Sequence, residues 1–296
     1  MNTNHDPEAA QFITEDIDRF WVVFPALDEA DAETRFELEY LQVGTPGLQS
    51  FIHLRIGTAE ALLTKIRSCR RYYASIRRST QEVPLYYSHF RASFRRLAEL
   101  YPEAVFPDTT FVIGRMNSGG TTDTSGLLIG TEIFGRASDS PVEELDDWER
   151  AVTLPVADLP FIVAHELIHV QQPSEQELTL LAQCLREGAA EFLGELISGR
   201  VCTPHIHHYG KAHEQQLWTR FSREMHGQTT EQWLYQGRGS GAEPADLGYF
   251  VGAQICRAYL DIHQGRRQAV HDLIHRAVWD PTGFLADSGY ERGFLV

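Results

Sequence analysis

Residues 161–172 read FIVAHELIHVQQ, and this stretch decides how the rest of the chain is interpreted. His165 and His169 are four residues apart, so on an α-helix they project from the same side at adjacent turns. Neutral imidazoles at this spacing can both reach one Zn²⁺ at about 2.0–2.1 Å. Glu166 is offset by one residue, beside the metal, where its carboxylate can take a proton from an activated water and pass it to a leaving amine. The stretch therefore predicts a helix that carries a hydrolytic zinc site.

The residues around this HELIH pentad are apolar. Apolar surroundings exclude water and so strengthen the electrostatic interactions of a metal ion with its ligands. HExxH on a helix is the arrangement typical of zinc metalloproteases. A buried helix can also produce these five letters by chance. The stretch HEQQL at 213–217 shows this, because it repeats only the first half of the pattern.

A catalytic zinc site needs a third protein ligand and an open position. The segment ELTLLAQCLREGAAEFLGELISG (177–199) predicts a second helix that Gly199 ends. Glu187 and Glu191 stand among apolar residues on one face of this helix. One carboxylate can bind the metal while the other, a turn later, accepts a hydrogen bond from a ligand histidine. The alternative is that Glu187 is a surface charge.

HELIH followed by REGAAEF resembles the gluzincin clan of zinc metallopeptidases. The resemblance implies that Glu187 is the third ligand and that Glu191, where aspartate is usual, orients a ligand histidine. Further stretches resemble predicted bacterial zinc-dependent proteases related to a gliding-motility lipoprotein. They are LYPEAVFPDTTFVIGRMNSGGTT, GLLIGTEIF, GYFVGAQICRAYL and DSGY. The two resemblances imply one zincin-like peptidase domain with Zn²⁺ as cofactor and a peptide or protein as substrate.

The hydrophobic pattern predicts a mostly helical α+β fold with one small sheet upstream of the HExxH helix. Residues 1–10 are predicted to be disordered and residues 11–296 to form a single domain. The expected parts of that domain are a helical N-terminal part (11–100), a small sheet (about 105–135), catalytic helices (about 158–200) and a C-terminal helical part (211–290). The Gly/Ser/Thr run Ser118–Ser125 predicts a flexible loop between two strands.

Peptidases of the gluzincin clan bind substrate as an added strand along a sheet edge, where backbone hydrogen bonds give affinity without a fixed sequence. The expected edge is Gly126–Ile133 or Met116–Thr122, and an ordinary hairpin is the alternative. The residues predicted at the substrate are Asn117, Gly119, Gly120, Gly126, Leu127 and Leu128.

A zinc hydrolase also needs a hydrogen-bond donor for the developing oxyanion. Tyr249, in the LGYFVG stretch, is the first choice for this catalytic role and Tyr290 is the second. Either can instead be a core aromatic residue. The histidines of the HIHH stretch (205–208) can rim the cleft or bind metal adventitiously, or lie in a solvated loop.

The balance of 26 Lys+Arg against 41 Asp+Glu gives a net charge of −15, which argues against nucleic acid or an anionic membrane surface as partner. We expect a cytoplasmic protein, because no leader and no run of eighteen apolar residues is visible. The oligomeric state is not predicted. Cys184 and Cys256 are expected to be buried hydrophobes.

Together these patterns predict a zinc-dependent peptidase in which His165, His169 and Glu187 bind the metal and Glu166 is the general base. The main competing interpretation is a non-catalytic zinc-containing protein that binds peptides or acts as a scaffold on the same fold. A more distant one is hydrolysis of a non-peptide bond by the same activated water.

Overall fold

The computed structural model describes residues 4–174, 178–201, 203–236 and 243–294. The chain divides into two compact units. Unit 1 is Met1–Arg91 with Val105–Glu166, and unit 2 is Ala92–Ala104 with Leu167–Val296. The boundaries fall partly inside helices, because both α7 (Tyr87–Leu100) and α9 (Leu159–Gln171) continue from unit 1 into unit 2.

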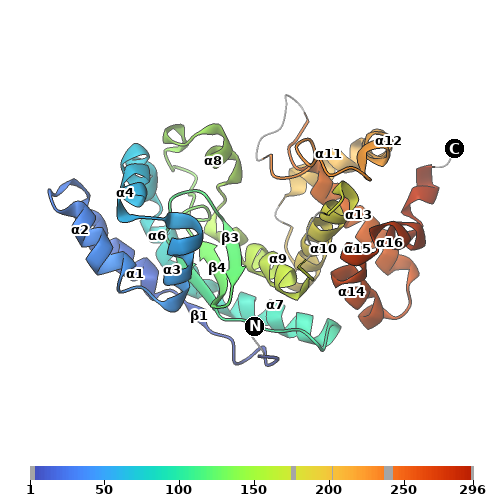
Figure 1. Cartoon of the computed structure of the whole chain (residues 1–296), viewed down its shortest axis with the longest axis horizontal. Helices are drawn as coiled ribbons and strands as arrows, with labels where there is room; N and C mark the ends of the chain where they lie inside the picture. Colours follow the sequence, from blue (N-terminus) through green and yellow to red (C-terminus); the bar gives the residue numbers. More distant parts are fainter. Residues whose placement is uncertain (1–3, 175–177, 202, 237–242, 295–296) are drawn as a thin grey trace. The chain divides into compact units, whose positions relative to one another are not determined.

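Unit 1 contains a four-stranded sheet with the order β1-β2-β4-β3 among the described residues. Figure 1 labels β1, β3 and β4 of this sheet. Its strands are β1 (Phe12–Ile13), β2 (Thr109–Val112), β3 (Gly120–Asp123) and β4 (Gly126–Gly130). Pairing is parallel for β1 with β2 and for β2 with β4, and antiparallel for β3 with β4. Every residue of β2 and β4 is buried, which explains their β-branched and apolar sequences TTFV and GLLIG.

Unit 1 also contains short helices. Those confined to it are α1 (Glu15–Val23), α2 (Ala32–Phe36), α3 (Pro46–Phe51), α4 (Ala59–Ser68), α5 (Arg70–Ser75), α6 (Arg77–Gln81) and α8 (Asp147–Val152). Of these, α1 and α3 contact the sheet. The predicted fold class, a mostly helical α+β chain with one small sheet upstream of the HELIH helix, is confirmed.

Two local expectations differ from the structure. The run Ser118–Ser125 was expected to be a loop, yet it contains β3, because its threonines pair with the apolar strand β4. Disorder was expected over residues 1–10, of which 1–3 lie outside the described residues. In residues 4–10, Asn4 exchanges hydrogen bonds with the backbone of Phe106, and Ala10 is buried.

Buried tyrosines fix the backbone where β2 and β4 end. Tyr40 donates its hydroxyl hydrogen to the carbonyl oxygen of Ile113 over 2.7 Å, and Tyr73 donates to that of Gly114 over 2.7 Å. Tyr72 donates to the carbonyl oxygen of Glu132 over 2.9 Å. Because buried tyrosine hydroxyls need partners, these contacts tie the segments that follow β2 and β4 to the core.

The side chain of Glu132 also holds the segment that follows β2. Its carboxylate is fully buried and accepts backbone N–H hydrogens from Gly114 over 2.8 Å and from Met116 over 3.1 Å. Burial raises the pKa of Glu132 to about 7, although these hydrogen bonds act in the opposite direction.

We expect this raised pKa to make unfolding depend on pH. A folded-state pKa above the unfolded value of 4.5 contributes stability that is complete below about pH 4.5 and is lost as pH rises through about 7. The loss is at most about 3.5 kcal/mol, since one pKa unit corresponds to about 1.4 kcal/mol. Urea unfolding midpoints between pH 5 and 8 should fall for the wild type and fall less for Glu132→Gln. Equal pH slopes for the two chains would contradict this assignment.

Unit 2 is built around α10 (Leu180–Ser198) and α13 (Leu247–Ile262). The other helices confined to unit 2 are α11 (Pro204–Ala212), α12 (Glu214–Glu224), α14 (Arg266–Ile274), α15 (Arg276–Trp279) and α16 (Pro281–Ser288). Gly188 of α10 and Gly252 of α13 face each other so closely that a Cβ on either would overlap backbone of the other helix. Gly188 therefore lets α10 and α13 pack with their backbones in contact.

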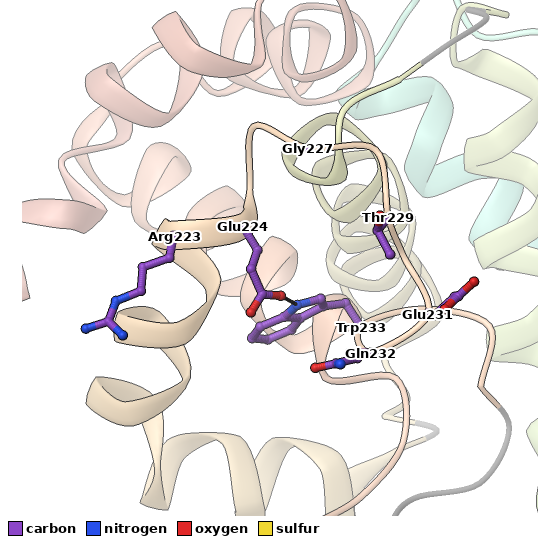
Figure 2. A pocket seen from close by; sticks show the side chains of 7 residues that line it. All are labelled: Arg223, Glu224, Gly227, Thr229, Glu231, Gln232 and Trp233. Atoms are coloured by element: carbon purple, nitrogen blue, oxygen red, sulfur yellow. Dashed lines mark hydrogen bonds between the residues drawn. The ribbon is translucent and has the colours of Figure 1, made fainter.

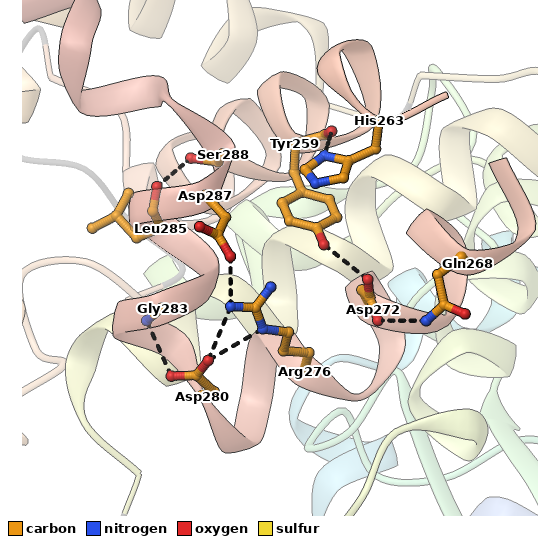
Figure 3. A network of polar contacts seen from close by, with 10 residues as sticks. All are labelled: Tyr259, His263, Gln268, Asp272, Arg276, Asp280, Gly283, Leu285, Asp287 and Ser288. Carbon is orange, nitrogen blue, oxygen red and sulfur yellow. Dashed lines mark hydrogen bonds and ion pairs between the residues drawn. The ribbon is translucent and has the colours of Figure 1, made fainter. Parts of the chain in front are cut away.

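A polar network joins the last helices of unit 2 (Figure 3). Tyr259 donates to Asp272 over 2.8 Å, and Arg276 forms ion pairs with Asp280 and Asp287.

Cys184 and Cys256 are fully buried, as predicted, and Cys202 lies outside the described residues. Within the described part of the chain, no helix combines the length and apolar character that crossing a membrane requires.

Candidate metal centre

Helix α9 places His165, Glu166 and His169 on a part of its surface that is not fully covered. Val163, Ala164, Leu167 and Ile168 are completely buried, so the helix packs on several sides. In contrast, His165, Glu166 and His169 are only half-buried. The apolar residues therefore anchor the helix while its polar side chains face a more open region.

Three side chains meet there in the way that the sequence predicts for metal ligands. His165, His169 and Glu187 each offer a ligand atom, and these atoms all lie within 4.8 Å of one another. His169 Nε2 lies 3.2 Å from Glu187 Oε2. Glu187 projects from α10 and is only 7% exposed. A carboxylate so deeply buried requires a positive or hydrogen-bonding partner.

This donor set fits zinc. Two imidazoles and one carboxylate form a recognised ligand set for catalytic zinc, with metal–ligand distances of about 2.0–2.2 Å. Two ligand atoms at that distance from a tetrahedral ion lie about 3.4 Å apart. The 3.2 Å separation of His169 Nε2 and Glu187 Oε2 agrees with that spacing.

Gln172 orients His169. The Oε1 atom of Gln172 lies 2.7 Å from His169 Nδ1, while its Nε2 donates to the carbonyl oxygen of Arg186 over 2.8 Å. Because the Gln172 amide donates to Arg186, its oxygen faces His169 and accepts the Nδ1–H hydrogen, which leaves Nε2 with a lone pair. Gln172 was not among the predicted site residues, although it stands three residues after the candidate ligand His169.

Tyr235 holds the carboxylate of the candidate ligand Glu187. Its hydroxyl donates to Glu187 Oε1 over 2.9 Å, so that Oε2 is the oxygen near His169. Burial first, and the charge of Glu187 second, raise the pKa of Tyr235 well above its ordinary value. Tyr235 also has φ +62°, a strained conformation for a residue with a Cβ. The stretch QWLYQG offers no motif that marks this tyrosine.

The two tyrosines predicted as oxyanion donors lie in different places. The ring of Tyr249 is 6.5 Å from that of Tyr235, and burial and Glu187 raise the pKa of Tyr249 well above its ordinary value. Tyr290 instead donates its hydroxyl to Glu214 over 2.8 Å and packs edge-on against Trp218. The structure thus brings Tyr249, but not Tyr290, near the candidate ligand Glu187 through Tyr235.

Glu191 lies one turn beyond Glu187 and has further contacts. It accepts a hydrogen bond from Thr203 over 2.8 Å, and His207 Nε2 lies 3.5 Å from the same oxygen. His207 is also 3.2 Å from Glu195, so these three residues form a second group with metal-ligand geometry. His205, His207 and His208 belong to helix α11, so the favoured expectation that they lie in a solvated loop is wrong. The role of Glu191 toward a ligand histidine stays a prediction.

In unit 1, strand β3 lies against the carboxylate of Glu166. A Cβ on Gly120 would be 2.5 Å from Glu166 Oε1, so only a glycine leaves room for this side chain. Asn117 donates to the carbonyl oxygen of Arg55 over 2.8 Å. The structure therefore brings the Gly119–Gly120 end of the predicted substrate segment to Glu166.

The other predicted substrate residues occupy an interior strand. Gly126, Leu127 and Leu128 belong to β4, which pairs with β2 on one side and β3 on the other. A strand with two neighbours has no free edge for a peptide, so the expectation that Gly126–Ile133 forms the edge is wrong. The alternative, Met116–Thr122, includes the first residues of β3 at the end of the described sheet.

Residues 150–275 match the model of a family described as Predicted Zn-dependent protease (DUF2268). The matched range includes both helices that carry the three candidate ligands. The match supports zinc dependence and protease activity at the level of that family description. Neither the curated proteins nor the solved structures provide a match to this chain.

A separate pocket of about 430 Å³ lies elsewhere in unit 2 (Figure 2). Its lining residues are Arg223, Glu224, Gly227, Thr229, Glu231, Gln232 and Trp233. Glu224 accepts the indole N–H hydrogen of Trp233 over 2.8 Å, so this carboxylate already has a partner. None of the candidate metal ligands lines this pocket, and it does not alter the assignment of the site.

Proposed function

We propose that this chain is a zinc-dependent peptidase that hydrolyses peptide bonds with Glu166 as general base. The observation that carries the proposal is the convergence of His165, His169 and Glu187 within 4.8 Å, with Glu166 next to a ligand on the same helix. The family match over residues 150–275 supports the same conclusion. We also propose that the chain is related to the gluzincins and to the predicted proteases that resemble a gliding-motility lipoprotein.

His165, His169 and Glu187 would hold Zn²⁺, which would supply Lewis-acid polarisation of the substrate carbonyl and would make a water easier to deprotonate. Glu166 accepts the proton of the attacking water on a carboxylate oxygen. It then delivers this proton to the nitrogen of the leaving amine, so that an amine departs and a carboxylic acid remains. Gln172 and Tyr235 keep the lone pairs of His169 and Glu187 directed toward one point.

Strand β3 is the proposed substrate edge. It is the last strand of the described sheet and pairs with β4 alone, so a peptide can add to it through backbone hydrogen bonds. Gly120, which stands against Glu166, would bring the added peptide next to the general base. Tyr249 is the proposed donor to the developing oxyanion.

A non-catalytic zinc-containing peptide-binding protein is the second candidate. Structural zinc sites are closed by four protein ligands, whereas catalytic sites have three. The ligand group found among the described residues at α9 has three members, which favours catalysis.

The test is cleavage of a peptide library by the purified chain. We expect new amino termini in the products, complete loss of cleavage after treatment with a zinc chelator, and recovery when Zn²⁺ is restored. The chelated chain should also melt at a lower temperature, because a ligand that binds only the folded state stabilises it. Zinc-dependent stabilisation without any cleavage would favour the peptide-binding alternative. Cleavage that survives chelation would contradict both.

A further inference from the structure

Arg55 lies beside the strand that the proposed function assigns to substrate binding. It belongs to the π-helical segment η3 (Ile52–Ile56) of unit 1 and is half-buried. Its Nη2 donates to the hydroxyl oxygen of Thr121 in β3 over 3.0 Å. The Nε atom of Arg55 is buried without a hydrogen-bond acceptor. The guanidinium group therefore retains unused donors next to β3.

No carboxylate among the described residues forms an ion pair with Arg55. The chain has 41 acidic residues against 26 basic ones, and other arginines, such as Arg35 and Arg71, each pair with two glutamates. Arg115 is a second arginine at this place, and its Nε donates to the carbonyl oxygen of Arg55 over 2.9 Å. A half-buried guanidinium without an ion-pair partner favours the binding of an acidic group from another molecule.

The positions of Arg55 and Glu166 along β3 define where that group would lie. Gly120 faces Glu166 and Thr121 contacts Arg55. Successive residues of a strand point to opposite faces and advance about 3.3 Å, so the two side chains flank β3 at adjacent positions. A peptide added along the edge alternates in the same way. The peptide residue that lies at Glu166 would therefore be next to a peptide residue whose side chain points toward Arg55.

We propose that Arg55 is a specificity-determining residue that binds a carboxylate of the substrate beside the scissile bond. The inference rests on the proposed function, because it takes β3 as the substrate edge. The carboxylate is either an internal Asp or Glu side chain or the free C-terminus of a short peptide. In both cases the planar guanidinium offers paired N–H donors to two carboxylate oxygens.

The structural role of Arg55 is separable from this one. The adjoining loop is held by the main-chain carbonyl oxygen of Arg55, which accepts hydrogens from Arg115 and Asn117. A side-chain substitution leaves that carbonyl in place. The side chain itself has one hydrogen bond within the described residues, to Thr121. Removing the guanidinium should therefore change substrate preference much more than stability.

The test measures binding and cleavage of matched peptides. One pair differs by Asp against Asn next to the cleaved bond, and another by a free against an amidated C-terminus. For each variant, binding is measured in a chain that also carries Glu166→Gln, so that the peptide stays intact. The kcat/KM value is measured in a chain that retains Glu166. Arg55→Gln, Arg55→Lys and Arg55→Glu are compared with Arg78→Gln, a control at an exposed arginine paired with Glu82.

We expect the wild-type site to prefer the acidic member of one pair by at least about tenfold, with the preference lost in Arg55→Gln and partly kept in Arg55→Lys. Arg55→Glu should prefer a peptide with Lys in place of the Asp. Arg78→Gln should have the same peptide preference as the wild type. The pair that responds identifies the source of the carboxylate. The inference would be overturned if the acidic and the neutral member of each pair bound with equal affinity, or if the preference survived Arg55→Gln.

These outcomes are distinguishable from failure of the proposed function. Cleavage without acidic preference leaves the peptidase proposal intact and removes the role of Arg55. Absence of cleavage, with Arg55-dependent binding of acidic peptides, removes the peptidase proposal and keeps the carboxylate site. A chain that neither cleaves nor binds these peptides contradicts both.

Discussion

Glu166→Gln is expected to lower kcat by about 10³-fold or more while zinc content stays at the wild-type level. The amide has nearly the same shape as the carboxylate but cannot accept a proton from water or deliver one to the leaving amine. Glu166 is adjacent to a ligand without being part of the three-residue ligand group, so its substitution should spare the metal. Hydrolysis of a cleavable library peptide and metal analysis of the same sample give both quantities.

The matched control is Glu143→Gln, which removes an exposed carboxylate in unit 1 that pairs with Arg71. It should cleave like the wild type. Full activity of Glu166→Gln would contradict the proposed mechanism. Loss of both zinc and activity would instead indicate that Glu166 supports the metal site.

Gly120→Ala is expected to lower kcat/KM by about 10²-fold with little change in stability. The new Cβ would lie 2.5 Å from Glu166 Oε1 and 2.6 Å from Glu166 Cδ, which is closer than atoms can pack. The carboxylate is the end of a flexible side chain, so it moves aside and the fold is preserved. A general base that is displaced by about 1 Å loses its alignment with water and substrate.

Gly293→Ala is the control for that substitution, because a Cβ there meets nothing within 4 Å. Melting temperature and zinc content should be close to wild type for both variants, and only Gly120→Ala should lose activity. An active Gly120→Ala chain would show that Glu166 does not work from the position it occupies beside β3.

The sequence predicts the parts of the site that depend on spacing within one helix. The four-residue interval of His165 and His169, and the apolar surroundings of Glu187, are local patterns, and the structure brings these three residues together. The helical character of α10 and the burial of Cys184 follow from the same periodicity. The single-domain organisation and the cytoplasmic location stay predictions.

The remaining features depend on contacts between distant segments, which periodicity does not reveal. Tyr235 reaches Glu187 from 48 residues away, and Arg55 reaches Thr121 from 66 residues away. The order of the strands decided which predicted edge was available, because β4 inserts between β2 and β3. Alternation and turn signals predict strands but do not determine which strand is last in a sheet.

The most direct test of the central claim is a crystal structure of the zinc-loaded chain with anomalous scattering measured at the zinc absorption edge. We predict one peak within about 2.3 Å of a nitrogen of His165, a nitrogen of His169 and an oxygen of Glu187. A peak only at the group of Glu191, Glu195 and His207, or no peak bonded to the two HELIH histidines, would contradict the account.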